Sequence, residues 1–108
     1  KRYFFGIVKV DGDSMYPTLK DGEYVVMKIT DDVEVGDIII LHVDYEYGMT
    51  SEYIIKRVAE IAEDGSVYVL GDNAEHSFDS RQCGYFPREI IRGKVIVGGD
   101  INAAGIHE

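Results

Sequence analysis

The stretch Gly12-Asp13-Ser14-Met15-Tyr16-Pro17-Thr18-Leu19 governs how the rest of the chain is interpreted. Gly12 frees the backbone just before Ser14, and the ring of Pro17 fixes φ just after it, so the chain is expected to turn at Ser14. A hydroxyl held on a stiff turn is suited to act as a nucleophile. The same pattern is also typical of a serine that caps a helix or closes a local turn, and this stretch alone favours that structural interpretation.

A serine nucleophile needs a base. Three histidines are present, His42, His76 and His107, but none stands in a context like that of a serine hydrolase, and no Gly-x-Ser-x-Gly motif occurs. The other solution is a neutral lysine, and Lys56 lies among Ile and Val residues in segment 53–58. Burial there would lower the lysine pKa, provided that no carboxylate lies beside it. The competing interpretation is a lysine that reaches from a strand edge into water.

Three blocks of sequence resemble, in the same order, the type I signal peptidases. The blocks are Ser14-Met15-x-Pro17-Thr18-Leu19, Lys56-Arg57-Val58 and Gly71-Asp72-Asn73-x-x-x-Ser77-x-Asp79-Ser80-Arg81-x-x-Gly84. The resemblance runs from about Val8 to Val97, and the long third block is the most specific part of it. Members of this family are Ser-Lys proteases that remove signal peptides from exported proteins. The resemblance implies that Ser14 is the nucleophile and Lys56 the general base.

The resemblance also implies supporting roles for residues around the site. Ser77 matches the family serine that hydrogen-bonds the catalytic lysine and orients its amine. Asp79 with Arg81, and Asp72 with Arg57, are expected to form ion pairs that fix the loop under the site. As single surface pairs they would contribute little to stability.

The oxyanion hole is expected to use the backbone N–H of Ser14. Some family members add a hydroxyl two positions earlier, where this chain has Gly12, so that donor is absent. The long insertion of the large bacterial enzymes is reduced here to a hairpin within 58–70, as in minimal members of the family. The substrate is therefore either the general pool of exported proteins or one dedicated client, and His76 has no assigned role.

Composition limits the other function classes. The chain has 108 residues, which indicates one domain, and its 20 acidic and 11 basic residues give a net charge of −9. This charge argues against nucleic acid as a partner and against charge-driven docking on anionic lipid. The single Cys83 excludes an intramolecular disulfide, and a Cys83–His76 nucleophilic pair is disfavoured because no orienting third group is evident. Asp44, Glu46 and Glu52 lack calcium-loop spacing, so no metal or cofactor is expected.

The start of the chain suggests a membrane interface. No run of about 18 apolar residues occurs, so the sequence contains no membrane span. Lys1-Arg2-Tyr3-Phe4-Phe5 combines basic and aromatic residues of the interfacial type, although a first strand would also explain the aromatic residues. With the signal peptidase resemblance, we expect an anchoring helix before residue 1 and a catalytic domain on the extracytoplasmic face.

The pattern of apolar residues predicts an all-β domain. Six segments are expected to be strands: 3–10, 23–29, 37–43, 53–62, 66–70 and 90–97. Segment 53–62 also fits a helical stripe, and the family resemblance assigns it to a strand. A single helical turn is expected at 87–89, and Gly93 is a possible bulge. A closed or partly closed, coiled antiparallel barrel would hide the sheet edges, with residues 1–97 as the catalytic domain and 98–108 as a mobile tail.

Three functions are compatible with these features. The first is a signal-peptidase-type serine endopeptidase that cleaves preproteins after small residues. The second is a repressor-type autoprotease, which needs a cleavable segment ahead of Ser14, whereas Ala104-Gly105, which resembles such a bond, lies at the wrong end. The third is a non-catalytic β-barrel module, which the presence of both Ser14 and Lys56 disfavours.

Overall fold

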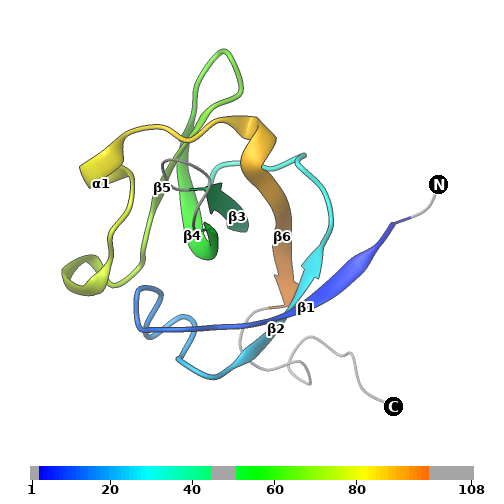
Figure 1. Cartoon of the computed structure of the whole chain (residues 1–108), viewed down its shortest axis with the longest axis vertical. Coiled ribbons are helices and arrows are strands. Elements are labelled where there is room, and N and C mark those ends of the chain that lie inside the picture. The colour runs from blue at the N-terminus through cyan, green and yellow to red at the C-terminus, as the bar shows by residue number, and fades with distance from the viewer. Residues whose placement is uncertain (1–2, 45–50, 98–108) are drawn as a thin grey trace.

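A computed structural model describes residues 3–44 and 51–97, which form one antiparallel β-sheet with little helix (Figure 1). The strands are β1 (Phe5–Lys9), β2 (Tyr24–Lys28), β3 (Ile38–Asp44), β4 (Ser51–Ile61), β5 (Val67–Leu70) and β6 (Ile91–Val97). The helical turns are η2 (Ala74–His76), α1 (Ser80–Cys83) and η3 (Arg88–Ile90). The predicted all-β class is confirmed, and the ambiguous segment that contains Lys56 is a strand.

The sheet has the strand order β1-β2-β6-β3-β4-β5, with β1 and β5 at its two edges. It curves but does not close, so the closed barrel considered from the sequence is not formed (Figure 1). An isolated backbone pair between Val67 and Phe86 covers part of the β5 edge. This pairing protects an edge that barrel closure would otherwise have to hide.

Strand β3 is buried on both faces, as its continuous run of Ile and Leu predicts. Ile39 and Leu41 point into one core cluster, and Ile40 points into a second cluster on the other face. The second cluster contains Met15 and Leu19, both fully buried. The segment around Ser14 is therefore attached to the core of the sheet through its own apolar side chains.

Strand β6 joins the two halves of the sheet and is irregular at both contacts. Its register shifts between Gly93 and Ile91 opposite β3, which agrees with a bulge at Gly93, and it shifts again opposite β2. A Cβ atom at Gly93 would lie 2.4 Å from Met27 Cγ and 2.5 Å from the carbonyl oxygen of Lys28. Only glycine lets β6 approach β2 this closely.

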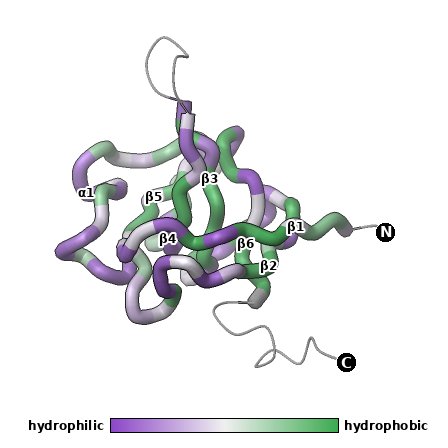
Figure 2. The backbone as a smooth tube through the Cα atoms, turned by 60° about the horizontal axis from the view of Figure 1, so that its bottom comes forward, coloured by the Kyte–Doolittle hydropathy of each residue, from purple (hydrophilic) through white to green (hydrophobic). Residues whose placement is uncertain are grey.

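Figure 2 shows that β1 is largely hydrophobic, whereas the chain around α1 is mostly hydrophilic or neutral. No helix among the described residues is long and apolar enough to cross a bilayer. Three sequence predictions lie outside the described residues: the basic start at residues 1–2, the Glu46 region of the 45–50 loop, and the tail at 98–108.

Candidate active site

Ser14 lies in a tight turn that the core holds in place. The Tyr16 N–H donates to the Asp13 carbonyl at 3.1 Å, and the Leu19 N–H donates to the Met15 carbonyl at 2.9 Å. Gly12, just before Ser14, has a φ of +93°, a conformation that favours glycine. Because Met15 and Leu19 are buried, the Ser14 hydroxyl is held at a defined position while its side chain stays half-buried.

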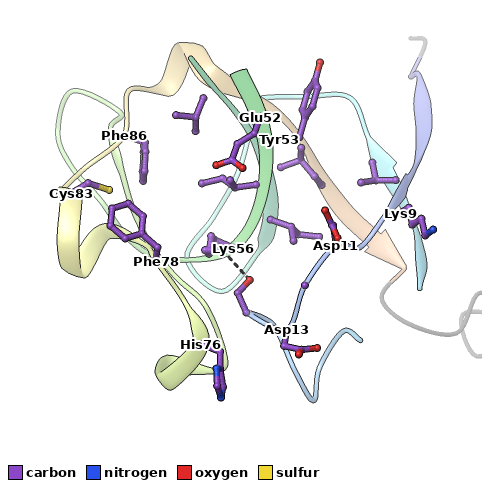
Figure 3. A pocket seen from close by; sticks show the side chains of 17 residues that line it. Lys9, Asp11, Asp13, Glu52, Tyr53, Lys56, His76, Phe78, Cys83 and Phe86 are labelled. Carbon is purple, nitrogen blue, oxygen red and sulfur yellow. Dashed lines mark hydrogen bonds between the residues drawn. The ribbon is translucent and has the colours of Figure 1, made fainter. Parts of the chain in front are cut away.

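Lys56 comes from the middle of β4 and reaches the same point. It is paired across the sheet with Ile39 and is only 6% exposed. Its Nζ lies 2.9 Å from Ser14 Oγ, within hydrogen-bonding distance, as the dashed line in Figure 3 shows. The fold thus joins two residues that are 42 positions apart in the sequence.

Burial lowers the pKa of Lys56 below the ordinary lysine value, because the charged ammonium loses its solvation. The carboxylates of Asp79 and Glu52 oppose this shift by stabilising the charged form. The condition set from the sequence, that no carboxylate lies near Lys56, is therefore not fully met. Burial outweighs both carboxylates, so the net shift favours the neutral amine.

The loop that follows β5 is fastened directly to the Ser14 turn. The backbone N–H of Asn73 donates to the Ser14 carbonyl at 2.8 Å, and the Asn73 side chain donates to the Asp13 carbonyl at 3.0 Å. Sequence reasoning assigned no role to Asn73. Its position in the third motif block was the available signal, but the partners are backbone carbonyls, which no side-chain pattern reveals.

Gly71 lets this loop approach the Ser14 turn. A Cβ atom there would lie 2.2 Å from Ser77 Oγ and 2.7 Å from the Ser14 carbonyl oxygen, far inside van der Waals contact. We expect Gly71→Ala to separate the loop from the turn and to lower both the melting temperature and peptide cleavage. Gly6→Ala is the matched control, because its Cβ would meet only the Met27 side chain at 3.4 Å. If both variants behave like the wild type, the close approach at Gly71 does not matter for the site.

Asp72 clamps three parts of the chain together. Its carboxylate accepts hydrogen bonds from Arg57 Nε and Nη2 at 2.9 and 2.8 Å and from the Thr18 hydroxyl at 2.6 Å. Arg57 also donates to the Gly36 carbonyl at 2.8 Å. The hydrogen bond from Arg57 is the main cause that lowers the pKa of Asp72. The Arg57–Asp72 ion pair expected from the sequence is present, and Thr18 is a partner that sequence reasoning missed.

Asp79 is the most heavily bonded residue of the loop and is completely buried. Its carboxylate accepts from Arg81 Nη2 at 2.6 Å, from the Gly71 N–H at 2.8 Å and from the Ser77 hydroxyl at 2.6 Å, and it caps α1 through the Arg81 N–H. Burial opposes ionisation, but these hydrogen bonds together hold the pKa of Asp79 far below its usual range. The Arg81–Asp79 ion pair expected from the sequence is present.

Ser77 and Ser80 form hydrogen bonds that hold this loop in place. The hydroxyl of Ser77 donates a hydrogen bond to Asp79. The sequence predicted a hydrogen bond between Ser77 and Lys56 instead. Ser80 is buried, and its Oγ accepts a hydrogen bond from the Val69 N–H at 2.8 Å, which ties α1 to β5. Sequence reasoning gave Ser80 no role, because a serine that bonds a distant strand backbone leaves no local pattern.

Ser14 and Lys56 open into a cleft of about 430 Å³ (Figure 3). Its walls are mostly apolar and come from β1, β3, β4 and the loop before β6. His76 and Cys83 also line it, and burial raises the pKa of the Cys83 thiol, which makes the thiol a poor nucleophile. Residues 3–44 and 51–97 contain no group of side chains able to hold a metal ion. The cleft can therefore present one serine hydroxyl and one buried amine to a bound peptide.

Comparison with known proteins indicates a peptidase. The mitochondrial inner membrane protease subunit 1 of Schizosaccharomyces pombe is 29% identical over 117 residues, which covers 87% of this chain and 73% of that protein. A family profile described as Peptidase S24-like matches residues 3–96. Both findings support the resemblance to signal-peptidase-type proteases seen in the motifs. Because the profile spans most of its length, the chain belongs to the Peptidase S24-like family.

Proposed function

We propose that the protein is a serine endopeptidase of the signal peptidase I type, with Ser14 as nucleophile and Lys56 as general base. The observation that carries this proposal is the 2.9 Å contact between Ser14 Oγ and the buried Lys56 Nζ. A lysine can accept a proton near neutral pH only when its pKa is lowered, and burial acts in that direction here. The peptidase family and the protease relative support the same reaction class.

In the first half of the proposed reaction, neutral Lys56 takes the proton of Ser14 as Oγ attacks the scissile carbonyl. The carbonyl oxygen becomes an oxyanion, and the Ser14 N–H donates to it. That N–H has no acceptor among the described parts of the chain, so it is free to do so. The protonated Lys56 then gives its proton to the departing amine, which leaves an ester on Ser14.

In the second half, water replaces the leaving peptide. Lys56, neutral again, removes a proton from this water, and the resulting hydroxide attacks the ester carbonyl. The intermediate collapses, Lys56 returns the proton to Ser14 Oγ, and the new carboxyl product leaves. One water is consumed and one peptide bond is cut, and the protein returns to its starting state.

The proposed substrates are preproteins that carry a signal peptide. The relative is named as a subunit of an inner membrane protease, which favours a catalytic domain that works beside a membrane. We extend the proposal to an anchor before residue 1 and to action on the extracytoplasmic face. A dedicated maturation protease for one client fits the same site, since the short β4–β5 hairpin removes the surface that a large insertion would supply.

Peptide specificity tests the proposed function. Small residues, such as Ala, are expected at the first and third positions before the cut, because branched side chains of β3 and β4 line the cleft beside Ser14. The measurement is digestion of a peptide library by the wild type, with Ser14→Ala as the inactive control. Equal cleavage after Leu, Phe or Lys would contradict the signal-peptidase type. Cleavage of the chain itself in place of peptides would favour the autoprotease.

A further inference from the structure

One end of the cleft is built from three side chains of the segment between β5 and β6. They are Phe78, Cys83 and Phe86, and Figure 3 shows them together on one side of Lys56, across the cleft from Asp11 and Asp13. Phe78 is 69% exposed, although the next residue in the chain is completely buried. An exposed aromatic ring that lines a cleft beside a nucleophile is a surface that a ligand can cover.

The backbone at this end of the cleft is fixed, so it is ready to bind without further ordering. Phe78 lies between Ser77 and Asp79, whose side chains are hydrogen-bonded to each other at 2.6 Å. Phe86 is joined to Val67 by two backbone hydrogen bonds of 2.8 and 2.9 Å. Cys83 Sγ donates to the Asp79 carbonyl at 3.2 Å. A preorganised apolar surface of this kind loses little entropy when a ligand binds.

We infer that Phe78 and Phe86 form a subsite for one bulky apolar side chain of the substrate peptide, such as Leu or Phe. This inference rests on the proposed peptidase function and names part of its substrate. The two rings offer no charge or hydrogen bond to a polar side chain, and the raised pKa of the Cys83 thiol keeps that neighbour neutral as well. A charged or strongly polar side chain that packs on the two rings would lose part of its hydration and gain no hydrogen bond from them.

The subsite belongs to a substrate position other than the first or third before the cut. In an extended peptide, alternate side chains point to opposite sides, so the first and third share one direction. Those two positions are the ones proposed to require small residues. The bulky side chain must therefore come from a neighbouring position, before or after the scissile bond.

A positional scan tests the subsite. Peptides with Ala at the first and third positions carry either Leu or Ser at each other position in turn. The wild type is expected to cleave the Leu peptide with about tenfold higher kcat/KM at one position. Phe78→Ser should abolish this preference at that position alone, and Phe78→Leu should keep most of it. The control is Phe5→Ser, which removes a ring that is 55% exposed on β1 and does not line the cleft.

A binding measurement separates the subsite from catalysis. Cys83 is the chain's single cysteine, so iodoacetamide at alkaline pH labels one known point of the subsite. In Ser14→Ala, the Leu peptide of the preferred position should slow labelling of Cys83, and the Ser peptide should not. A Phe78→Ser enzyme that keeps the tenfold preference, or equal labelling with both peptides, would overturn the subsite. If the wild type cleaves no peptide, the proposed function fails. The subsite is then tested by labelling alone: at least one Leu peptide of the series should slow labelling of Cys83 more than its Ser counterpart does, and equal rates throughout would overturn the subsite.

Discussion

Lys56→Arg is expected to lower kcat for peptide cleavage by at least about 10³-fold, as much as Lys56→Ala does. Arginine keeps a positive charge and a long stem, so an electrostatic or packing role of Lys56 would survive the change. A guanidinium does not give up its proton at any working pH, so a role of Lys56 as general base would be lost in Lys56→Arg. The measurement is single-turnover cleavage of an Ala-x-Ala peptide by both variants.

Ser14→Ala completes this comparison. The two residues act as a unit, so combining Ser14→Ala with Lys56→Ala should cost little more than either change alone. Lys20→Arg serves as the control, because Lys20 is exposed and lies outside the cleft. Near wild-type turnover in Lys56→Arg would rule out Lys56 as the base and would leave the activation of Ser14 without an explanation.

Asp79→Ala is expected to cost about 3 kcal/mol of stability, because it removes a fully buried carboxylate that accepts several hydrogen bonds. The loss leaves the Gly71 N–H and the Ser77 hydroxyl without their acceptor and removes the cap of α1. The measurement is the melting temperature, together with cleavage at a temperature where the variant is still folded. Asp32→Ala, at an exposed position between β2 and β3, is the control and should change the melting temperature little.

Asp79→Asn separates the shape of the Asp79 side chain from its charge. The amide can still accept a hydrogen bond from Ser77, but it no longer stabilises the charged form of Lys56. The pKa of Lys56 should fall further, so the rise of activity with pH should move to lower pH.

An Asp79→Ala protein with full stability and no activity would show that the structural role assigned to Asp79 is wrong.

Part of the fold follows from sequence because β3 and the turn between β4 and β5 carry strong local signals, whereas the segment of β4 also fits a helix and is assigned to a strand by the family resemblance. The continuous run Ile38-Ile39-Ile40-Leu41 is apolar on both faces, which is typical of a strand in the middle of the core, and Ile39, Ile40 and Leu41 are indeed buried. The Asp64-Gly65 turn marks the hairpin, and Gly65 indeed has a φ of +92°. The strand order could not be predicted from sequence. The insertion of β6 between β2 and β3 depends on contacts between distant segments, which leave no local pattern.

Some residues of the candidate site could also be predicted from the sequence, and others could not. Ser14 and Lys56 could be selected from the sequence because the three motif blocks occur in the order of the signal peptidases, whereas the local pattern around each residue alone favours a structural role. The hydrogen-bond partner of Ser77 could not be predicted, because the packing of the loop decides that its hydroxyl donates to Asp79. The role of Phe78 was also invisible, since an aromatic residue beside a buried aspartate looks like an ordinary core residue until its exposure is known.

Titration of Lys56 by NMR, in protein labelled at lysine Cε, tests the central claim most directly. The Lys56 signal is identified by its loss in Lys56→Arg. Because burial disfavours the ammonium, Lys56 is expected to titrate below the ordinary lysine value, and kcat/KM of the wild type is expected to rise with pH through the same midpoint. A Lys56 that titrates at or above the ordinary lysine value, while cleavage already proceeds at neutral pH, would contradict the neutral-lysine mechanism.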